Sequence, residues 1–365
     1  MSAPPIAATP DLDNPSPEQR IVIKAMMGTP IAEENLAGIR LAAMPLAGGI
    51  FVQLDLSGAD FSGADLRETV FERCQLAGAR FDKALLRGAL FNHCQAVGSS
   101  WAGASLRQAR FTECDLSGAT MPGADLNLAA LIKTTLSQVD LRGGFIDRTS
   151  FIECSAPKAI FDGLTMHSVL FHRCGLDGAS LAEVKIQLGA FTETPLPGRS
   201  FAGMDLMGVQ FIGSALEGCD FSGARIEKCN FQRAQLDGAS FRRARAANAL
   251  FPEATGSGCD FNGADLNQAI FVKSKWQGCR FDGANLHQTI WTESELIKCS
   301  LRDAELMYAD FSHANLERSD FEGARMQRSK LHKARDTGAR FSDRARALET
   351  DPVLAKAEDW PGGKA

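Results

Sequence analysis

Tyrosine is almost absent from this 365-residue chain: the only one, Tyr308, stands beside 23 phenylalanines. Proteins that place aromatic rings at surfaces and binding sites favour tyrosine, because its hydroxyl group reaches water. Phenylalanine without tyrosine therefore indicates rings that are buried with no polar partner to meet.

Neither sign of charge dominates, since 44 acidic and 39 basic residues give a net charge of −5. A strongly basic chain would indicate nucleic-acid binding, and a strongly acidic one a mimic of nucleic acid. No apolar run approaches the roughly 20 residues that span a bilayer, and the opening MSAPPIAATPDLDNPSPEQ lacks the pattern of a signal peptide. We expect a cytoplasmic protein that contacts neither membranes nor nucleic acid directly. Ten cysteines without an export signal fit a reducing compartment.

Large apolar residues recur every five positions from Leu36 to Leu331. Of the 23 phenylalanines, 22 stand at positions whose number ends in 1, and Phe145 is the exception; positions ending in 6 are mostly leucine. Two residues before each such centre the chain is small, and all ten cysteines occupy this slot. Two residues after the centre glycine is common, as at Gly58 and Gly63, and glycine permits the positive φ that a type II turn requires. A period of five fits neither an amphipathic helix nor a plain strand.

A second period of 20 residues shows how the five-residue units are arranged. In one column of residues spaced by 20, the sign of charge alternates at nearly every step below its first pair. Opposite charges attract when neighbours stack about 4.8 Å apart, so residues 20 apart are predicted to lie above one another, and we interpret the column as specifying register. The ladder residues are Arg73, His93, Glu113, Lys133, Glu153, Arg173 and Glu193.

Four five-residue units per coil predict an all-β solenoid of about 14 coils, near 70 Å long at about 4.8 Å per coil. The recurring A(D/N)Lxx units, seen as ADLRE, ADLNQ and ANLER, resemble the pentapeptide repeat family. That resemblance covers about four fifths of the chain and implies a right-handed quadrilateral β-helix. The weakest part should lie near Ala246 and Gly256, where two large centres are missing; we expect a local bend or cavity there, partly filled by Trp276.

A solenoid exposes core and backbone at both ends, so we expect helical caps. Residues 1–15 are rich in proline and predicted to be disordered. Residues 16–35 form an N-terminal helical cap, begun by Ser16, Pro17 and a capping box with Gln19. Residues 36–344 form the β-helix, and 345–365 a C-terminal cap or tail with a helix from Asp351 to near Trp360. Family members often dimerise through C-terminal elements, so homodimerisation through these residues is the alternative to capping.

The slot just before each centre normally faces solvent, but on one side it is repeatedly apolar. On the opposite side the same slot carries residues such as Asp60, Arg80 and Ser100. An apolar ladder on an outer wall is a candidate partner-binding surface, and its alternative is a strip that only packs against itself. This apolar stripe comprises Ile50, Val70, Leu90, Leu170, Leu250, Ile270 and Ile290.

Catalytic and metal chemistry find little support. Zinc needs ligands that converge on one point, whereas a column of parallel thiols does not converge, and neighbouring parallel Cβ vectors suit disulfides poorly. We interpret the cysteines as small buried apolar residues. No nucleophile elbow, phosphate loop or dinucleotide fingerprint is present, and the six histidines suggest no triad. We therefore expect no enzyme activity, no metal and no cofactor.

Two classes of function remain. The first is a rigid scaffold or adaptor that binds a protein partner along a solenoid face. A weaker likeness, carried by the long array and the tail ARALETDPVLAKAEDW, implies a bacterial type VI secretion accessory of this kind. The second is mimicry of DNA, as in pentapeptide repeat proteins that bind DNA gyrase. The basic segment 225–246, with arginines such as Arg225, Arg242 and Arg245, argues against an acidic mimic.

Overall fold

The computed structural model describes residues 15–360. They divide into two compact units, residues 1–165 with 174–184 and residues 166–173 with 185–365. Each unit is a parallel β-solenoid in which every turn takes 20 residues, and together they contain about 15 turns against the 14 expected. Four five-residue units therefore make one turn, as the 20-residue columns predicted.

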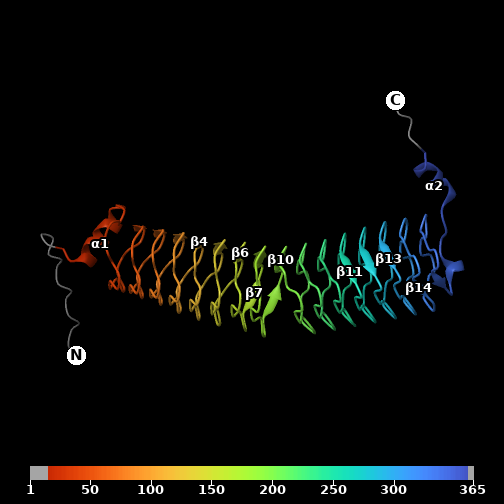
Figure 1. The fold of residues 1–365 in the computed structure, drawn as a ribbon, viewed down its shortest axis with the longest axis horizontal. Coiled ribbons are helices and arrows are strands. Elements are labelled where there is room, and N and C mark those ends of the chain that lie inside the picture. Colours follow the sequence, from red (N-terminus) through yellow and green to blue (C-terminus); the bar gives the residue numbers. More distant parts are fainter. Residues whose placement is uncertain (1–14, 361–365) are drawn as a thin grey trace, which may run out of the picture. The chain divides into compact units, whose positions relative to one another are not determined.

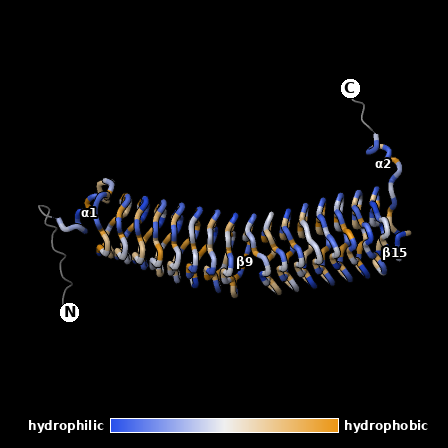
Figure 2. The backbone as a smooth tube through the Cα atoms, viewed as in Figure 1, coloured by the Kyte–Doolittle hydropathy of each residue, from blue (hydrophilic) through white to orange (hydrophobic). Residues whose placement is uncertain are grey.

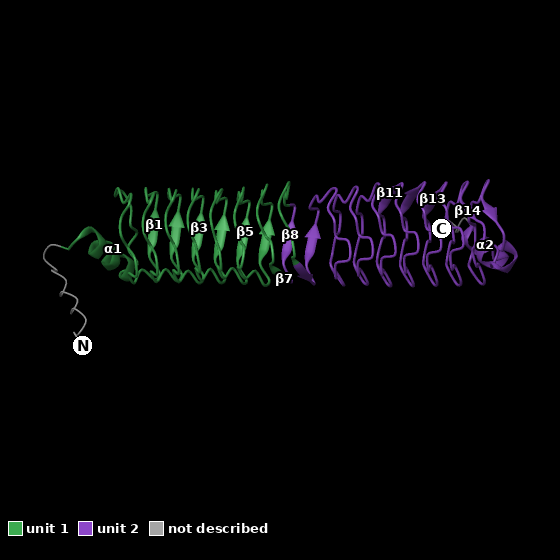
Figure 3. Ribbon diagram, turned by 90° about the horizontal axis from the view of Figure 1, so that it is seen from below, with its two compact units in different colours: residues 1–165, 174–184 green, residues 166–173, 185–365 purple. Residues whose placement is uncertain are grey.

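The first unit stacks six three-residue strands in parallel on one side, which Figure 3 shows in green. Their register is 20 residues at every step, so that Phe51 pairs with Phe71 and Phe71 with Phe91. The strands are β1 (Ile50–Val52), β2 (Val70–Glu72), β3 (Leu90–Asn92), β4 (Arg110–Thr112), β5 (Ala130–Ile132) and β6 (Ser150–Ile152). The remaining sides are joined by single bridges with the same register, such as Asp60 to Arg80.

The second unit repeats this architecture with shorter sheets. Strand β7 (Thr165–His167) begins in the first unit and ends in the second. Strand β8 pairs in parallel with β10. Strand β12 lies between β11 and β13 and pairs in parallel with both, and β14 pairs with β15. Their bounds are β8 (Leu170–His172), β9 (Lys185–Gln187), β10 (Ala190–Thr192), β11 (Thr255–Ser257), β12 (Lys275–Gln277), β13 (Glu295–Ile297), β14 (Asp320–Phe321) and β15 (Arg340–Phe341).

The core of each unit consists of columns of buried apolar side chains, most of them phenylalanine or leucine. Phe51 stacks on Phe71 with ring centroids 4.8 Å apart, while the contact between Phe51 and Phe61, on the opposite side, is edge-on at 6.1 Å. Burial of each ring stabilises the fold by roughly 1.5–3 kcal/mol. Figure 2 shows the consequence along the backbone, where apolar positions recur in turn after turn.

The missing centre at Gly256 is filled by its neighbour. Trp276, which pairs with Gly256 across β11 and β12, is 1% exposed and contacts the rings of Phe251 and Phe261 edge-on. A Cβ atom on Gly256 would lie 2.6 Å from Cys259 Sγ and 2.8 Å from the Trp276 ring. The pocket found here is an open groove of about 350 Å³ on the outer surface along β11–β13, and not an internal cavity, because Trp276 occupies the core position beneath it.

The N-terminal helix α1 (Pro17–Met26) begins with the capping box: the Ser16 hydroxyl accepts from the Gln19 N–H, and the Gln19 side chain accepts from the Ser16 N–H. The helix buries Ile21 and Ala25, and Ala25 packs beside Gly49. Figure 1 shows the helix at the start of the first unit. The expected tail, residues 1–15, lies outside the described residues apart from residue 15.

The C-terminal segment closes the second unit by backbone pairing. Leu331 N–H donates to the Leu348 carbonyl at 2.8 Å, and the Arg344 guanidinium lies 5.6 Å from the Phe341 ring centroid. After the short turn η1 (Arg344–Arg346) the chain enters α2 (Pro352–Glu358), in which no residue is buried. Within residues 15–360 neither helix has the length and hydropathy to cross a membrane.

Candidate functional site

The apolar stripe is two separate patches. In the first unit Ile50, Val70 and Leu90 pair in consecutive turns, and the column then continues with Arg110 and Ala130. We call Ile50, Val70 and Leu90 the first apolar patch. Leu90 is 37% exposed and the other two are half-buried, so these side chains offer their outer surfaces to solvent.

The second apolar patch, Leu250, Ile270 and Ile290, lies in the second unit. Single bridges join these residues in consecutive turns, and Ile290 is 37% exposed. Leu170, also predicted to belong to the stripe, pairs instead with Ala190, whose own neighbour is Gln210. Leu170 is therefore separated from the second patch by small and polar residues.

At two of its steps, the charge ladder brings a basic and an acidic side chain of consecutive turns into contact. His93 Nδ1 lies 3.3 Å from Glu113 Oε2 in the first unit, and Arg173 Nε lies 2.8 Å from Glu193 Oε2 in the second. Arg173 holds the pKa of Glu193 below its ordinary value. Arg73 contacts Glu72 of its own strand at 3.7 Å. Exposed pairs of this kind contribute at most about 1 kcal/mol, so their main effect is on register.

The ladder residues share a backbone strain that the sequence did not indicate. All seven have positive φ, between 50° and 53°. This is the turn position at which the sequence analysis expected glycine, yet more non-glycine residues than glycines adopt it here. The stacked turns therefore impose the left-handed conformation on whatever residue stands there.

The ten cysteines are all buried and carry thiols rather than disulfides. Their thiols donate to backbone carbonyls 23 residues earlier, as from Cys229 to Leu206 at 2.9 Å. Burial raises the pKa of the Cys219 thiol to about 11 and that of Cys229 to about 12. Because the thiolate is the nucleophile and the metal ligand, these side chains serve as core residues.

The basic segment 225–246 is neutralised by its neighbours. Arg225 Nη1 lies 2.7 Å from Asp205 Oδ2, and Arg245 Nη2 lies 3.0 Å from Glu227 Oε1. Asp260 Oδ2 lies 2.9 Å from Arg242 Nη1 and 2.8 Å from Arg280 Nη2, so one carboxylate pairs with two arginines. This part of the second unit therefore presents a mixed surface and neither a basic nor an acidic wall.

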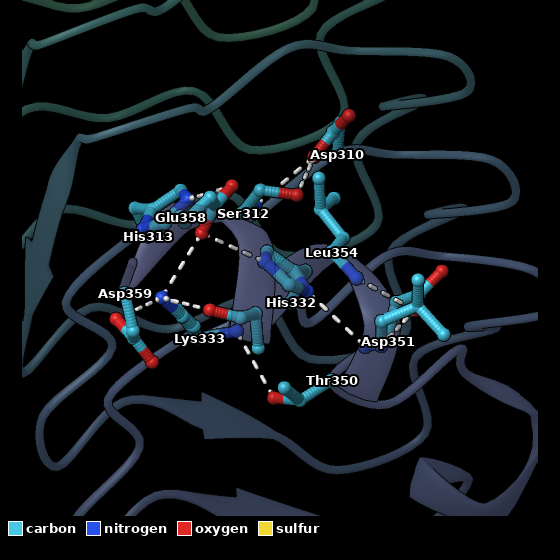
Figure 4. Close-up of polar contacts among 12 residues, drawn as sticks. Asp310, Ser312, His313, His332, Lys333, Thr350, Asp351, Leu354, Glu358 and Asp359 are labelled. Carbon is cyan, nitrogen blue, oxygen red and sulfur yellow. Dashed lines mark hydrogen bonds and ion pairs between the residues drawn. The ribbon is translucent and has the colours of Figure 1, made fainter. Parts of the chain in front are cut away.

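A cluster of charged residues that the sequence analysis missed holds helix α2 (Figure 4). We call His313, His332, Lys333, Glu358 and Asp359 the C-terminal cluster. Glu358 accepts through both oxygens: His313 Nε2 lies 3.3 Å from Oε1, and His332 Nε2 lies 3.1 Å from Oε2. Lys333 Nζ lies 3.1 Å from Glu358 Oε2 and 2.6 Å from Asp359 Oδ1.

The start of α2 determines the tautomer of the neutral His332 ring. Asp351 caps the helix, because its Oδ1 accepts from the Val353 and Leu354 N–H groups. Its own N–H donates to His332 Nδ1 at 3.1 Å. Since Nδ1 accepts, the neutral ring carries its proton on Nε2 and donates it to Glu358. His332 is only 5% exposed.

The contacts of the C-terminal cluster keep Glu358 ionised. Hydrogen bonds from His332, Lys333 and His313 lower its pKa from an ordinary 4.5 to about 2. The ladder column includes His313 and the expected helix contains Glu358, so both elements were visible in the sequence. The C-terminal cluster could not be predicted, because the repeat ends before α2 and its periodicity does not indicate where this helix packs on the last turns.

The fold is a four-sided parallel β-solenoid built from five-residue units, with apolar patches on its outer wall. Models of the pentapeptide repeat region match residues 46–121 and 274–345, and models of pentapeptide repeats (8 copies) match 109–144, 205–243 and 234–271. The chain belongs to the pentapeptide repeat proteins, whose members are generally structural or binding proteins. No curated protein matches its sequence.

Solved structures of pentapeptide repeat proteins resemble the fold at low sequence identity. HetL, involved in heterocyst differentiation regulation in the cyanobacterium Nostoc sp. strain PCC 7120, is 19% identical over 82% of this chain and 86% of its own, with a TM-score of 0.25. A trypsin-treated variant of QnrB1, a plasmid-mediated fluoroquinolone resistance protein, is 20% identical over 43% of this chain and 88% of its own, with a TM-score of 0.27.

Proposed function

We propose that this protein is a non-enzymatic scaffold or adaptor that binds a protein partner along a face of its solenoid. The observation that carries the proposal is the second apolar patch, in which Leu250, Ile270 and Ile290 adjoin in three consecutive turns. On the opposite side of the solenoid the same slot holds mostly polar side chains. Partly exposed apolar side chains grouped on an outer wall are typical of protein-interaction surfaces. The first apolar patch offers a second surface of the same kind.

The finer parts of the proposal concern setting and assembly. We place the protein in the cytoplasm as a bacterial type VI secretion accessory, on the likeness of its long array and C-terminal segment to such proteins. We further propose that residues 345–365 mediate homodimerisation. Val353 is 78% exposed and Trp360 is 73% exposed, so the segment carries apolar side chains that the rest of the second unit leaves uncovered.

Gyrase binding by mimicry of DNA is the alternative, and the distribution of charge weighs against it. A mimic needs a continuous acidic wall, because it replaces rows of phosphates. The acidic slots here meet arginines: Asp140 lies 2.7 Å from Arg142, and Asp260 is bound by both Arg242 and Arg280. These pairs interrupt the negative potential that a mimic of DNA would present, which weighs against gyrase binding by mimicry.

The test is a triple substitution, Leu250→Lys with Ile270→Lys and Ile290→Lys. The control carries lysine at Ser200, Ser240 and Ser300, in the equivalent slot on the opposite side. Affinity capture from the native organism, with mass spectrometry, should recover a partner with the wild type and the control and lose it with the patch variant. Equal recovery by the patch variant would exclude this patch as the binding surface. Binding of purified gyrase by the wild type would establish the alternative.

A further inference from the structure

The C-terminal cluster contains an unusual grouping of donor atoms. His313, His332 and Glu358 each offer one ligand atom, and these atoms all lie within 4.8 Å of one another. Two imidazoles and a carboxylate are a donor set that zinc accepts, at about 2.0–2.2 Å from each ligand. From these lengths, neighbouring ligands of a tetrahedral zinc ion lie roughly 3.3–3.6 Å apart. Each imidazole faces one oxygen of the same carboxylate: His313 Nε2 lies 3.3 Å from Glu358 Oε1, and His332 Nε2 lies 3.1 Å from Glu358 Oε2.

We propose that His313, His332 and Glu358 bind a divalent transition-metal ion of the zinc type, in competition with the hydrogen bond that seats the start of α2. The ion would join the last turns of the second unit to the C-terminal helix. His313 and Glu358 are partly exposed, at 37% and 31% of their side chains, so an ion can enter from solvent. This inference does not rest on the apolar patches, which lie on other turns of the solenoid, but its ligand Glu358 belongs to the segment 345–365 for which we propose homodimerisation.

The cluster already attracts a cation. The ammonium group of Lys333 lies 3.1 Å from Glu358 Oε2, and Lys333 also has Asp359 as a partner at 2.6 Å. A metal ion that takes Glu358 can therefore leave Lys333 paired with Asp359.

Competition with the helix cap follows from the tautomer of His332. Its Nε2 proton points to Glu358 because Nδ1 accepts from the Asp351 N–H. A metal at Nε2 takes the lone pair there, so the Nε2 proton leaves and the neutral ring carries its proton on Nδ1 instead. Two N–H groups would then face each other, and the Asp351 hydrogen bond would break. Metal binding thus loosens the N-terminal cap of α2 while holding its C-terminal end.

The first experiment titrates the untagged full-length protein with Zn²⁺ by calorimetry and with Co²⁺ by visible absorption. We expect one saturable site, with the intense d–d bands of tetrahedral Co²⁺. Loss of a ligand should weaken binding at least as much as loss of an outer-shell partner does, about 10- to 100-fold. Glu358→Gln and His313→Gln alter exposed side chains, and His332→Gln tests the buried ligand. Absence of saturable binding, or wild-type affinity in Glu358→Gln, would overturn the proposal.

Two further variants sharpen the result. His93→Gln removes the imidazole of an isolated histidine–carboxylate pair in the first unit, with the same 3.3 Å separation, and should leave the affinity unchanged. Lys333→Gln removes the competing cation and should tighten binding. Hydrogen exchange at the Asp351 amide should accelerate when metal is added. An Asp351 amide that stays protected in the metal-saturated protein would refute the competition with the cap.

Discussion

At the residue scale, the turns hold many side chains in a conformation that suits glycine. Gln138 has a φ of 57°, and no hydrogen bond or ion pair of its side chain accompanies that strain in the described residues. The left-handed conformation costs a non-glycine residue roughly 1–2 kcal/mol, while glycine loses about 0.5–1 kcal/mol more entropy on folding. We expect Gln138→Gly to stabilise the protein by about 0.5–1 kcal/mol in urea unfolding.

The reverse change is the matched control. Gly118 has a φ of 67° and open space around its missing Cβ, so Gly118→Ala tests strain without steric clash. It should destabilise the protein by a similar amount. A loss of stability in Gln138→Gly would show that these turns are not strained.

At Gly256, in contrast, the space around the missing Cβ determines the effect of a substitution, and the backbone conformation does not. Its φ is ordinary, but a Cβ would meet Cys259 Sγ and the Trp276 ring below 3 Å. Overpacking of this kind costs about 1–3 kcal/mol, so Gly256→Ala should lower the free energy of unfolding by that amount. Gly175→Ala is the control, because the nearest atom to its Cβ is 4.0 Å away. Equal stability of the two variants would mean that Trp276 can move aside.

At the scale of elements, helix α2 depends on charge because it buries no side chain. The pKa of Glu358 is about 2 in the fold and 4.5 ordinarily, so its contribution is fully present above pH 4.5 and is lost as pH falls towards 2. Hydrogen exchange of α2 should therefore be faster in Glu358→Gln than in the wild type at pH 6. At pH 2 the two proteins should exchange alike; a difference that persists there would contradict this attachment.

The contrast between the repeats and this helix shows what the sequence could supply. The period of 20 predicted the stacking of Phe51 on Phe71 and the column of His93 and Glu113, because identical turns must repeat identical contacts. The start of α2 was predicted from Asp351 and Pro352, which are local signals, while its end at Glu358 falls two residues before the expected Trp360. The contact of α2 with His332, in contrast, is a tertiary contact of a segment that does not repeat. The periodicity of the sequence therefore gives no indication of it.

At the scale of the whole molecule, stability is expected to be a sum over neighbouring turns, each of which contacts only the next. Deleting residues 75–94 removes one full turn of the first unit and leaves every column in register. Phe61 then faces Trp101, and Phe71 faces Phe111, so aromatic centres still stack on aromatic centres. We expect this protein to fold and to melt within a few degrees of the wild type.

Deleting only residues 75–79 is the decisive comparison. It removes one five-residue unit, so every later residue moves to the neighbouring side of the four-sided turn. Phe81 would then face Leu56, and Leu86 would face Phe61, so all four centres of one junction are mismatched. At about 1–3 kcal/mol for each misfitted centre, the junction should lose about 4–12 kcal/mol, although four times fewer residues are removed. Calorimetric melting of both deletions measures the difference. A five-residue deletion as stable as the 20-residue deletion would show that the columns of identical side chains do not determine register, and that any large apolar centre can stack on any other.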